Sequence, residues 1–311
     1  MAEEDFIEEI LTVASKIPTE SKNVLATVDI LDASILNKQA PKDVLSILSN
    51  SLAIDTSSNG GLGQVASFFL RGSNSNQTLV KVNGVKINPS TSGGASIYNF
   101  DTSLISKIEI GSGPFSSIHG SEAIGGVINI STIEDPDERF LVLSLNTGPD
   151  NLKKESLSTS WGKKETFLNL SLLNSKTNGF PTLSSSNLNR GYKNKSILST
   201  FTHQTKFLKG QISTWSSSGM TEYTGFEGVP MSQDYKNQVH AIDLSYETNK
   251  GFQVLANLGY SKDFIVQKQE NFLGLRDLIN TDRNSIEIMI HKPKLDSRSF
   301  VLGYNLEEED V

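Results

Sequence analysis

The sequence predicts an α+β domain followed by about nine antiparallel strands of an incomplete β-barrel. Up to Asp135, short apolar runs bounded by glycine or asparagine are mixed with short amphipathic turns. From residue 136 onward, apolar side chains recur at every second position in one segment after another. The charge changes at the same place, because residues 1–135 carry the whole net charge of −7 and the remainder is balanced. We therefore divide the chain near Asp135-Pro136-Asp137.

Composition excludes several classes of protein. The 311 residues contain no cysteine, which rules out disulfides, thiol chemistry and cysteine-based metal sites. No run approaches the roughly 18 apolar residues of a membrane helix, and no basic stripe suited to nucleic acid is present. The start, Met1-Ala2-Glu3-Glu4-Asp5, lacks the basic and apolar regions of a secretory signal. We expect either an intracellular protein or a sequence that begins near the mature end of a longer precursor.

The first domain is predicted to contain two short amphipathic turns, one hairpin turn and four strands. Ile30–Leu36 and Pro41–Leu48 are expected to be short amphipathic turns, and Pro41 suits a helix start. Asn83-Gly84 lies between two apolar runs and predicts a type I′ hairpin. The predicted strands are Ser67–Leu70, Thr78–Val82, Ser106–Ile110 and Val127–Ile130.

The second part alternates with a period of two, which places each apolar set on one face of a strand. Clear examples are Leu141, Leu143 and Leu145, and later Phe300, Leu302, Tyr304 and Leu306. In a soluble sandwich or barrel this face would point inward, over segments of about 5–6 residues. In an outer-membrane barrel it would point at lipid, over segments of about 9–11 residues. The long segments Glu165–Ser175, Lys195–Lys206 and Phe252–Asp263 favour the membrane barrel.

The predicted connections are unequal. Phe207–Gly210 and Glu247–Gly251 are short turns, whereas Asn178–Asn194, Gly219–Asn237 and Glu270–Arg283 are expected to be long loops. Short turns at one end and long loops at the other are typical of outer-membrane barrels. An odd number of strands is a poor candidate for closure, so the chain is predicted to be a truncated barrel.

Several glycine-rich motifs follow one another in the first domain. They are Asn59-Gly60-Gly61-Leu62-Gly63-Gln64, the run Arg71-Gly72-Ser73-Asn74-Ser75-Asn76, Val82-Asn83-Gly84-Val85, and Gly120 to Ile130. In order and spacing they resemble the plug domain of TonB-dependent outer-membrane receptors, and most closely the cobalamin (vitamin B12) receptor group. The resemblance covers roughly residues 8–135.

This resemblance implies an organisation and a site. Residues 1–20 would be an N-terminal segment, 21–135 an α+β plug domain, and 136–311 the first strands of a transmembrane β-barrel in the outer membrane. The loop around Gly61 and the loop 88–95 would lie at the plug apex, facing the extracellular side. The residues expected to contact a ligand are Asn59, Gly61, Gln64, Asn88, Ser90 and Ser92.

The N-terminal run Glu8–Ser15 resembles a TonB box, a short extended peptide exposed to the periplasm. Ile10, Leu11, Thr12, Val13 and Ala14 form its centre. Their β-branched and apolar side chains suit addition of a strand to the sheet edge of a TonB-type periplasmic energy-transducing protein. The family usually has Val-Thr-Ala where this chain has Thr-Val-Ala. An ordinary edge strand of the plug is the alternative interpretation.

Two departures from the family bear on mechanism. The family commonly has two plug arginines that pair with barrel glutamates. Arg71 matches the first, but the second position holds Ser112, and the glutamates would lie beyond residue 311. In the cobalamin receptors, acidic residues of early extracellular loops bind calcium. The loop 178–194 contains no Asp or Glu, so no metal site is predicted.

The predicted function is energy-coupled import of a small ligand across the outer membrane, with lipid around the barrel and no cofactor. Cobalamin is the expected ligand, and a ferric siderophore, an iron chelate, is the alternative. A soluble β-rich binding module and a passive porin also remain open. Catalysis is not predicted, because the four histidines fall singly and no nucleophile motif is present. Gly111-Ser112-Gly113 lacks the Lys-Ser/Thr of a phosphate loop, and His119 beside Ser121 and Glu122 is interpreted as a chance cluster.

Overall fold

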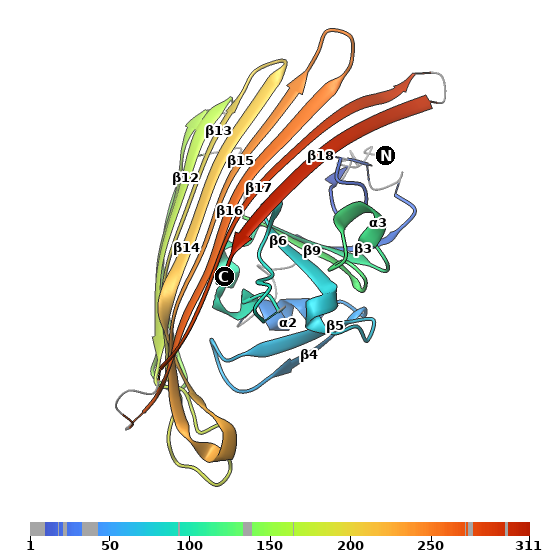
Figure 1. Cartoon of the computed structure of the whole chain (residues 1–311). Helices are drawn as coiled ribbons and strands as arrows, with labels where there is room; N and C mark the ends of the chain where they lie inside the picture. The colour runs from blue at the N-terminus through green and yellow to red at the C-terminus, as the bar shows by residue number, and fades with distance from the viewer. Residues whose placement is uncertain are drawn as a thin grey trace, which may run out of the picture.

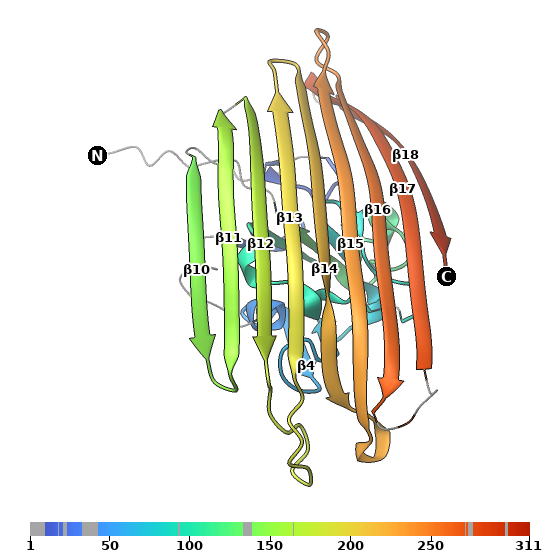
Figure 2. The same ribbon diagram turned by 90° about the vertical axis from the view of Figure 1, so that its left-hand side faces the viewer.

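The computed structural model describes the chain with several gaps. Its described residues are 10–17, 19–20, 24–32, 43–92, 94–132, 139–163, 165–270, 272, 276–295 and 298–311. Figures 1 and 2 show two parts, a small mixed domain and a tall curved sheet that wraps around one side of it.

A five-stranded mixed sheet forms the centre of the small domain. Its strand order is β3-β8-β9-β6-β7, and only β6 and β9 run parallel. The strands are β3 (Thr27–Asp32), β6 (Thr78–Val82), β7 (Val85–Lys86), β8 (Lys107–Ser112) and β9 (Gly126–Ser131). Asn83 and Gly84 both have positive φ, 49° and 78°, and connect β6 to β7. The predicted hairpin is therefore confirmed.

Smaller elements surround this sheet. Two two-stranded pairs are separate from it: β1 (Ile10–Leu11) with β2 (Thr19–Glu20), and β4 (Ile54–Ser58) with β5 (Ala66–Leu70). The helices are α2 (Val44–Leu48) and α3 (Ser116–His119), with 3-10 turns η2 (Ser75–Gln77), η3 (Ile97–Asn99) and η4 (Thr102–Leu104).

The helix α2 begins at its capping residue. Asp43 accepts a hydrogen bond from the Ser46 backbone N–H at 2.8 Å, and the Ser46 hydroxyl accepts from the Asp43 N–H at 3.3 Å. This reciprocal capping box satisfies two backbone donors that the first turn leaves free. The expected start at Pro41 lies outside the described residues.

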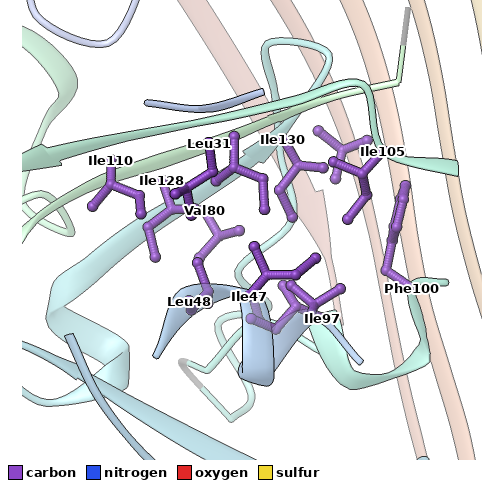
Figure 3. Close-up of a cluster of buried hydrophobic side chains, with 14 of the residues drawn as sticks. Leu31, Ile47, Leu48, Val80, Ile97, Phe100, Ile105, Ile110, Ile128 and Ile130 are labelled. Carbon is purple, nitrogen blue, oxygen red and sulfur yellow. The ribbon is translucent and has the colours of Figure 1, made fainter. Parts of the chain in front are cut away.

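The core of the domain lies between α2 and the central sheet. Figure 3 shows Ile47 and Leu48 of α2 facing Val80, Ile128 and Ile130, all of them buried. The core continues to the tall sheet, where the Phe100 and Trp215 rings have centroids 4.4 Å apart. The small domain and the sheet therefore share one apolar core at this point.

The tall sheet has nine antiparallel strands in sequence order, as predicted. They are β10 (Phe140–Gly148), β11 (Leu152–Lys163), β12 (Thr166–Thr177), β13 (Tyr192–Gln204), β14 (Leu208–Thr224), β15 (Pro230–Glu247), β16 (Gln253–Gln269), β17 (Arg276–Leu295) and β18 (Arg298–Asp310), with η5 (Phe226–Gly228) between β14 and β15. Every described neighbouring pair is joined in register, apart from one irregularity between Lys292 and Leu295.

The apolar faces of this sheet point away from the small domain. Leu141, Leu143 and Leu145 are 72%, 68% and 71% exposed, whereas Thr200 and Ser217 on the inner face are fully buried. A soluble barrel would show the opposite arrangement, because its apolar side chains fill the interior. The exposure therefore matches the membrane-barrel interpretation and argues against the soluble one.

Three predicted segments were wrong. Gly219–Asn237 is not a long loop, because β14 and β15 continue to Thr224 and from Pro230. Similarly, β17 already begins at Arg276, within the expected loop 270–283. Polar residues extend these strands because backbone pairing with a neighbour needs no apolar side chain. Ile30 to Asp32 belong to β3, which pairs with β8 far along the chain, and residues 33–36 lie outside the described residues.

Within the described ranges, no helix combines the length and the apolar character that crossing a membrane requires.

Candidate functional site

The loop between β4 and β5 lies at the end of the tall sheet that carries the long connection 178–191. Cβ atoms added to Gly60 and Gly61 would lie 2.8 Å from Thr182 and 3.1 Å from Phe180 of that connection. A Cβ on Gly63 would lie 2.1 Å from the Tyr192 ring at the start of β13. Only glycine allows the loop to approach so closely, which explains the spacing of these glycines.

The predicted contact residues of this loop differ in accessibility. Asn59 is exposed and its N–H donates to the Val65 carbonyl, while Gly61 is half-buried. Gln64 is buried, and its side-chain amide donates to the Glu222 carbonyl of β14. Gln64 therefore connects the loop to the tall sheet, and its contact with a ligand stays a prediction.

The second loop follows β7. Asn88 is 1% exposed, because its Oδ1 accepts from the Val80 N–H at 2.7 Å and its Nδ2 donates to the Thr78 carbonyl at 3.0 Å. Its side-chain amide therefore fixes the loop to β6, and a contact between Asn88 and a ligand stays a prediction. Ser90 and Ser92 are exposed, as a ligand-contacting role requires. Ser90 also donates its N–H to Glu309 of β18 at 3.0 Å.

The plug-anchor expectation rests on Arg71. This residue is exposed, has a φ of 48°, and forms no ion pair with any residue that the structure describes. At the second anchor position, Ser112 is 5% exposed and its hydroxyl lacks a hydrogen-bond partner among the described residues. Pairing of Arg71 with a barrel glutamate stays a prediction.

Hydrogen bonds between side chains and backbone groups join the small domain to the tall sheet, in addition to ion pairs such as Lys86–Glu307 and Lys154–Asp101. Asn99 of η3 is fully buried, and its Nδ2 donates to Asn237 Oδ1 at 2.9 Å. Its carbonyl accepts from Asn194 at 3.1 Å and from Ser217 at 3.2 Å. Asp263 completes the group by accepting from Asn237 at 2.6 Å. We did not predict this group, because no sequence signal connects residues more than 90 positions apart.

The N-terminal segment lies at the opposite end of the domain from the glycine loop between β4 and β5. Leu11 and Val13 are 1% and 2% exposed. The N–H groups of Thr12 and Val13 donate to Glu109 Oε2 at 3.0 and 3.2 Å, and His119 Nε2 is 2.7 Å from the Val13 carbonyl. The segment is extended in β1, as expected, but the expected exposure is not observed at Leu11 and Val13. A buried carboxylate satisfies its backbone donors, so the segment packs against the plug sheet.

The environment of this segment changes the proton affinity of two groups. Burial, and to a smaller extent the nearby Lys81 ammonium, lower the pKa of His119 to about 4. The Nδ1 atom of His119 is buried without a hydrogen-bond partner in the described residues, so an imidazolium would leave one donor unsatisfied. Burial also lowers the pKa of Lys81. His119 therefore contacts the N-terminal segment through Val13 and has no described hydrogen bond to Ser121 or Glu122.

A cavity of about 790 Å³ lies between this segment, the plug sheet and strands β14–β17. Its wall includes Lys16, Lys81, Lys107 and Glu287, and Lys16 forms an ion pair with Glu287. Charges of both signs line the cavity, so it does not select for one sign of ligand. In the part of the chain that the structure describes, no group of three or more metal-ligating side chains could hold a metal ion.

Comparison with known proteins agrees with this architecture. Residues 20–127 match the TonB-dependent Receptor Plug Domain. The chain is 27% identical over 323 aligned residues to the vitamin B12 transporter BtuB of Vibrio vulnificus strain YJ016, covering 97% of this chain and 50% of that protein. It is 28% identical to the protein of the same name from strain CMCP6, covering 81% of this chain and 43% of that protein. The chain thus spans about half the length of the curated relatives it matches.

A solved structure shows the same fold. BauA, the ferric preacinetobactin receptor from Acinetobacter baumannii, superposes with a TM-score of 0.78 at 13% identity, over 96% of this chain and 49% of BauA. The matched plug segment contains both loops and the central sheet except for most of β9, and the match to BauA covers 96% of the chain. Residues 20–127 therefore match the plug domain of the TonB-dependent receptors, and the nine strands that follow share the fold of the solved receptor BauA.

Proposed function

We propose that the chain supplies the plug and the adjoining barrel strands of an energy-coupled outer-membrane receptor. The observation that supports this most is the placement of two features at opposite ends of the plug. The glycine loop lies beside the long connection 178–191, whereas the Ile10–Ala14 segment lies near the short turns. Ligand binding at one end and attachment of a periplasmic protein at the other would use both features.

The ligand proposed for the apical end is a cobalamin. The curated relatives named above are vitamin B12 transporters, and the exposed Asn59, Ser90 and Ser92 offer neutral hydrogen-bonding groups suited to an amide-rich ligand. A ferric siderophore is the alternative, supported by the shared fold with a ferric preacinetobactin receptor. In either case the protein would move its ligand without making or breaking a covalent bond in it.

Growth experiments separate the two ligands. Cells that lack their own cobalamin and siderophore receptors, and express the gene for this protein, would be grown with limiting cobalamin or with limiting iron chelates. Rescue by cobalamin at nanomolar concentration supports the first ligand. Rescue only by an iron chelate supports the alternative, and rescue by neither refutes import of both.

We further propose that Ile10–Ala14 binds the TonB-type protein by strand addition. This mode depends on backbone hydrogen bonds more than on side chains. Val13→Pro removes one N–H and should abolish uptake, whereas Thr12→Val retains every backbone group and should leave uptake nearly unchanged. Binding of ligand to the cell surface should be equal for both variants. Normal uptake by the Val13→Pro variant would contradict coupling through this segment.

A further inference from the structure

Arg283 of β17 is a buried arginine at the interface between the tall sheet and the plug. Arg283 is only 2% exposed, and its guanidinium contacts the plug backbone. Nη2 donates to the Asn88 carbonyl at 2.7 Å, and Nη1 donates to the Lys86 carbonyl at 3.4 Å. A guanidinium at such a site needs several acceptors, because its charge is removed from water.

Glu309 of β18 supplies the counter-charge and a second contact with the same loop. Arg283 and Glu309 are direct cross-strand partners in the β17–β18 register, and their side chains form an ion pair. Glu309 Oε1 also accepts from the Ser90 N–H at 3.0 Å and from the Ser90 hydroxyl. The register of β17 and β18 by itself brings Arg283 and Glu309 side by side. Arg283 then bonds to Asn88 and Glu309 to Ser90.

The plug holds the same loop from its other side. The Asn88 side chain is bonded to the backbone of β6, so the peptide at position 88 is fixed by the plug through its side chain and by the sheet through its carbonyl. Beyond this point Ser90, Thr91 and Ser92 are exposed. Thr91 has one further contact, 3.4 Å between its hydroxyl and that of Thr281.

We propose that Arg283 and Glu309 are positioning residues for the apical loop 88–92, which they hold in the conformation that receives the ligand. The proposal rests on the proposed receptor function and adds the barrel residues on which that site depends. The pair acts through the loop backbone and needs no contact with the ligand. Order imposed in advance raises affinity, because the loop then loses less conformational freedom on binding.

The test uses Arg283→Met and Glu309→Gln in the purified protein, with Lys262→Met as a matched control. Lys262 forms an ion pair with Asp282, which is adjacent to Arg283 on β17, but neither of these residues has a described bond to the plug. Hydrogen exchange of residues 86–92 and binding of cyanocobalamin are measured for each variant. Exchange in β11–β13 reports whether the variants fold.

Both interface variants should exchange the amides of Asn88 and residues 90–92 about tenfold faster and bind cyanocobalamin about tenfold more weakly. The control should match the unaltered protein. Arg283→Lys should restore part of both properties, because an ammonium retains the charge but not the planar set of donors. A merely structural role would not predict this graded rescue together with unchanged exchange in β11–β13.

Unchanged loop exchange in both folded variants would overturn the proposal, as would faster exchange with unaltered affinity. Failure of the unaltered protein to bind cyanocobalamin is a different result. It refutes the cobalamin proposal, whereas the exchange difference between the interface variants and the control still decides whether the pair holds the loop.

Discussion

Removal of the Glu109 carboxylate should release the N-terminal segment from the plug. Glu109 is 1% exposed and accepts the Thr12 N–H, the Val13 N–H and the Thr12 hydroxyl on one oxygen, at 3.0, 3.2 and 3.2 Å. Its other oxygen pairs with Lys107 at 2.6 Å. In Glu109→Ala, the Thr12 and Val13 N–H groups lose their acceptor. They can donate to water instead only if the segment leaves the plug.

The size of the effect follows from these bonds. A hydrogen bond to a charged group contributes about 1.5–3 kcal/mol, and bonds that share one acceptor oxygen are not additive. The carboxylate also costs desolvation energy, and Glu109→Ala removes that cost. We therefore expect docking of the segment to weaken by about 2–4 kcal/mol, which lowers the ratio of docked to released states about thirty- to a thousandfold. Glu109→Gln retains one acceptor oxygen, so docking of the segment in this variant should be weaker than in the unaltered protein and stronger than in Glu109→Ala.

A single spin label provides the assay, because the chain contains no native cysteine. A nitroxide attached at Ala14→Cys should report slow motion in the docked segment and fast motion after Glu109→Ala. Glu122→Gln is the matched control, since Glu122 is a plug carboxylate that pairs with Lys86 and has no described contact with the segment. Equal label mobility in the Glu109→Ala variant, the control and the unaltered protein would refute the reasoning.

Three further predictions concern pH, the interface and the glycine loop. A released His119 should recover an ordinary pKa near 6.5, whereas the docked residue has a pKa of about 4. Docking should therefore be strongest above pH 6.5 and weaken by up to about tenfold per unit as the pH falls toward 4, measured by label mobility. Asn99→Ala should lower the free energy of unfolding by about 1–3 kcal/mol in urea titrations, because buried partners lose a hydrogen bond. Gly63→Ala should destabilise the protein by about 1–3 kcal/mol more than Gly72→Ala, because only the first added methyl meets an aromatic ring.

Each of these has its own control. His119→Leu should remove the pH dependence between 6.5 and 4, and a dependence that persists would assign it to another group. Asn76 is exposed, so Asn76→Ala should leave unfolding unchanged; an equal loss in both variants would contradict the role of the interface. Gly63 and Gly72 have similar φ, 71° and 78°, so backbone strain cancels between the two variants. Equal stability would show that the ring moves aside without cost.

Much of the fold could be predicted from local patterns. The predicted strand Thr78–Val82 has the bounds of β6, and the Asn83-Gly84 turn follows from the positive φ that both residues accept. The nine strands follow from alternation with a period of two. The bounds of the long strands could not be predicted, because β15 and β17 continue through polar residues whose only requirement is a paired neighbour.

The candidate site was less accessible to prediction than the fold. The glycine loop lies next to a long connection, and the side chains of Gln64 and Asn88, for which we predicted ligand contact, are buried and bonded to backbone groups. Both are polar residues in glycine-rich or turn segments, where exposure is the ordinary expectation. Their burial depends on Glu222 and on Val80, and no local pattern indicates those contacts.

The sequence by itself determined the kinds of elements and the order of the two parts. Strand alternation, turn residues and glycine motifs reflect the geometry of the backbone within a few residues, so they can be read along the chain. Only the tertiary structure decided that the apolar faces of the sheet point outward and that the N-terminal segment is packed. Glu109 meets Thr12 across 97 positions, and Arg283 meets Asn88 across 195. Such contacts depend on how strands from distant segments pair, and that information is distributed over the whole chain.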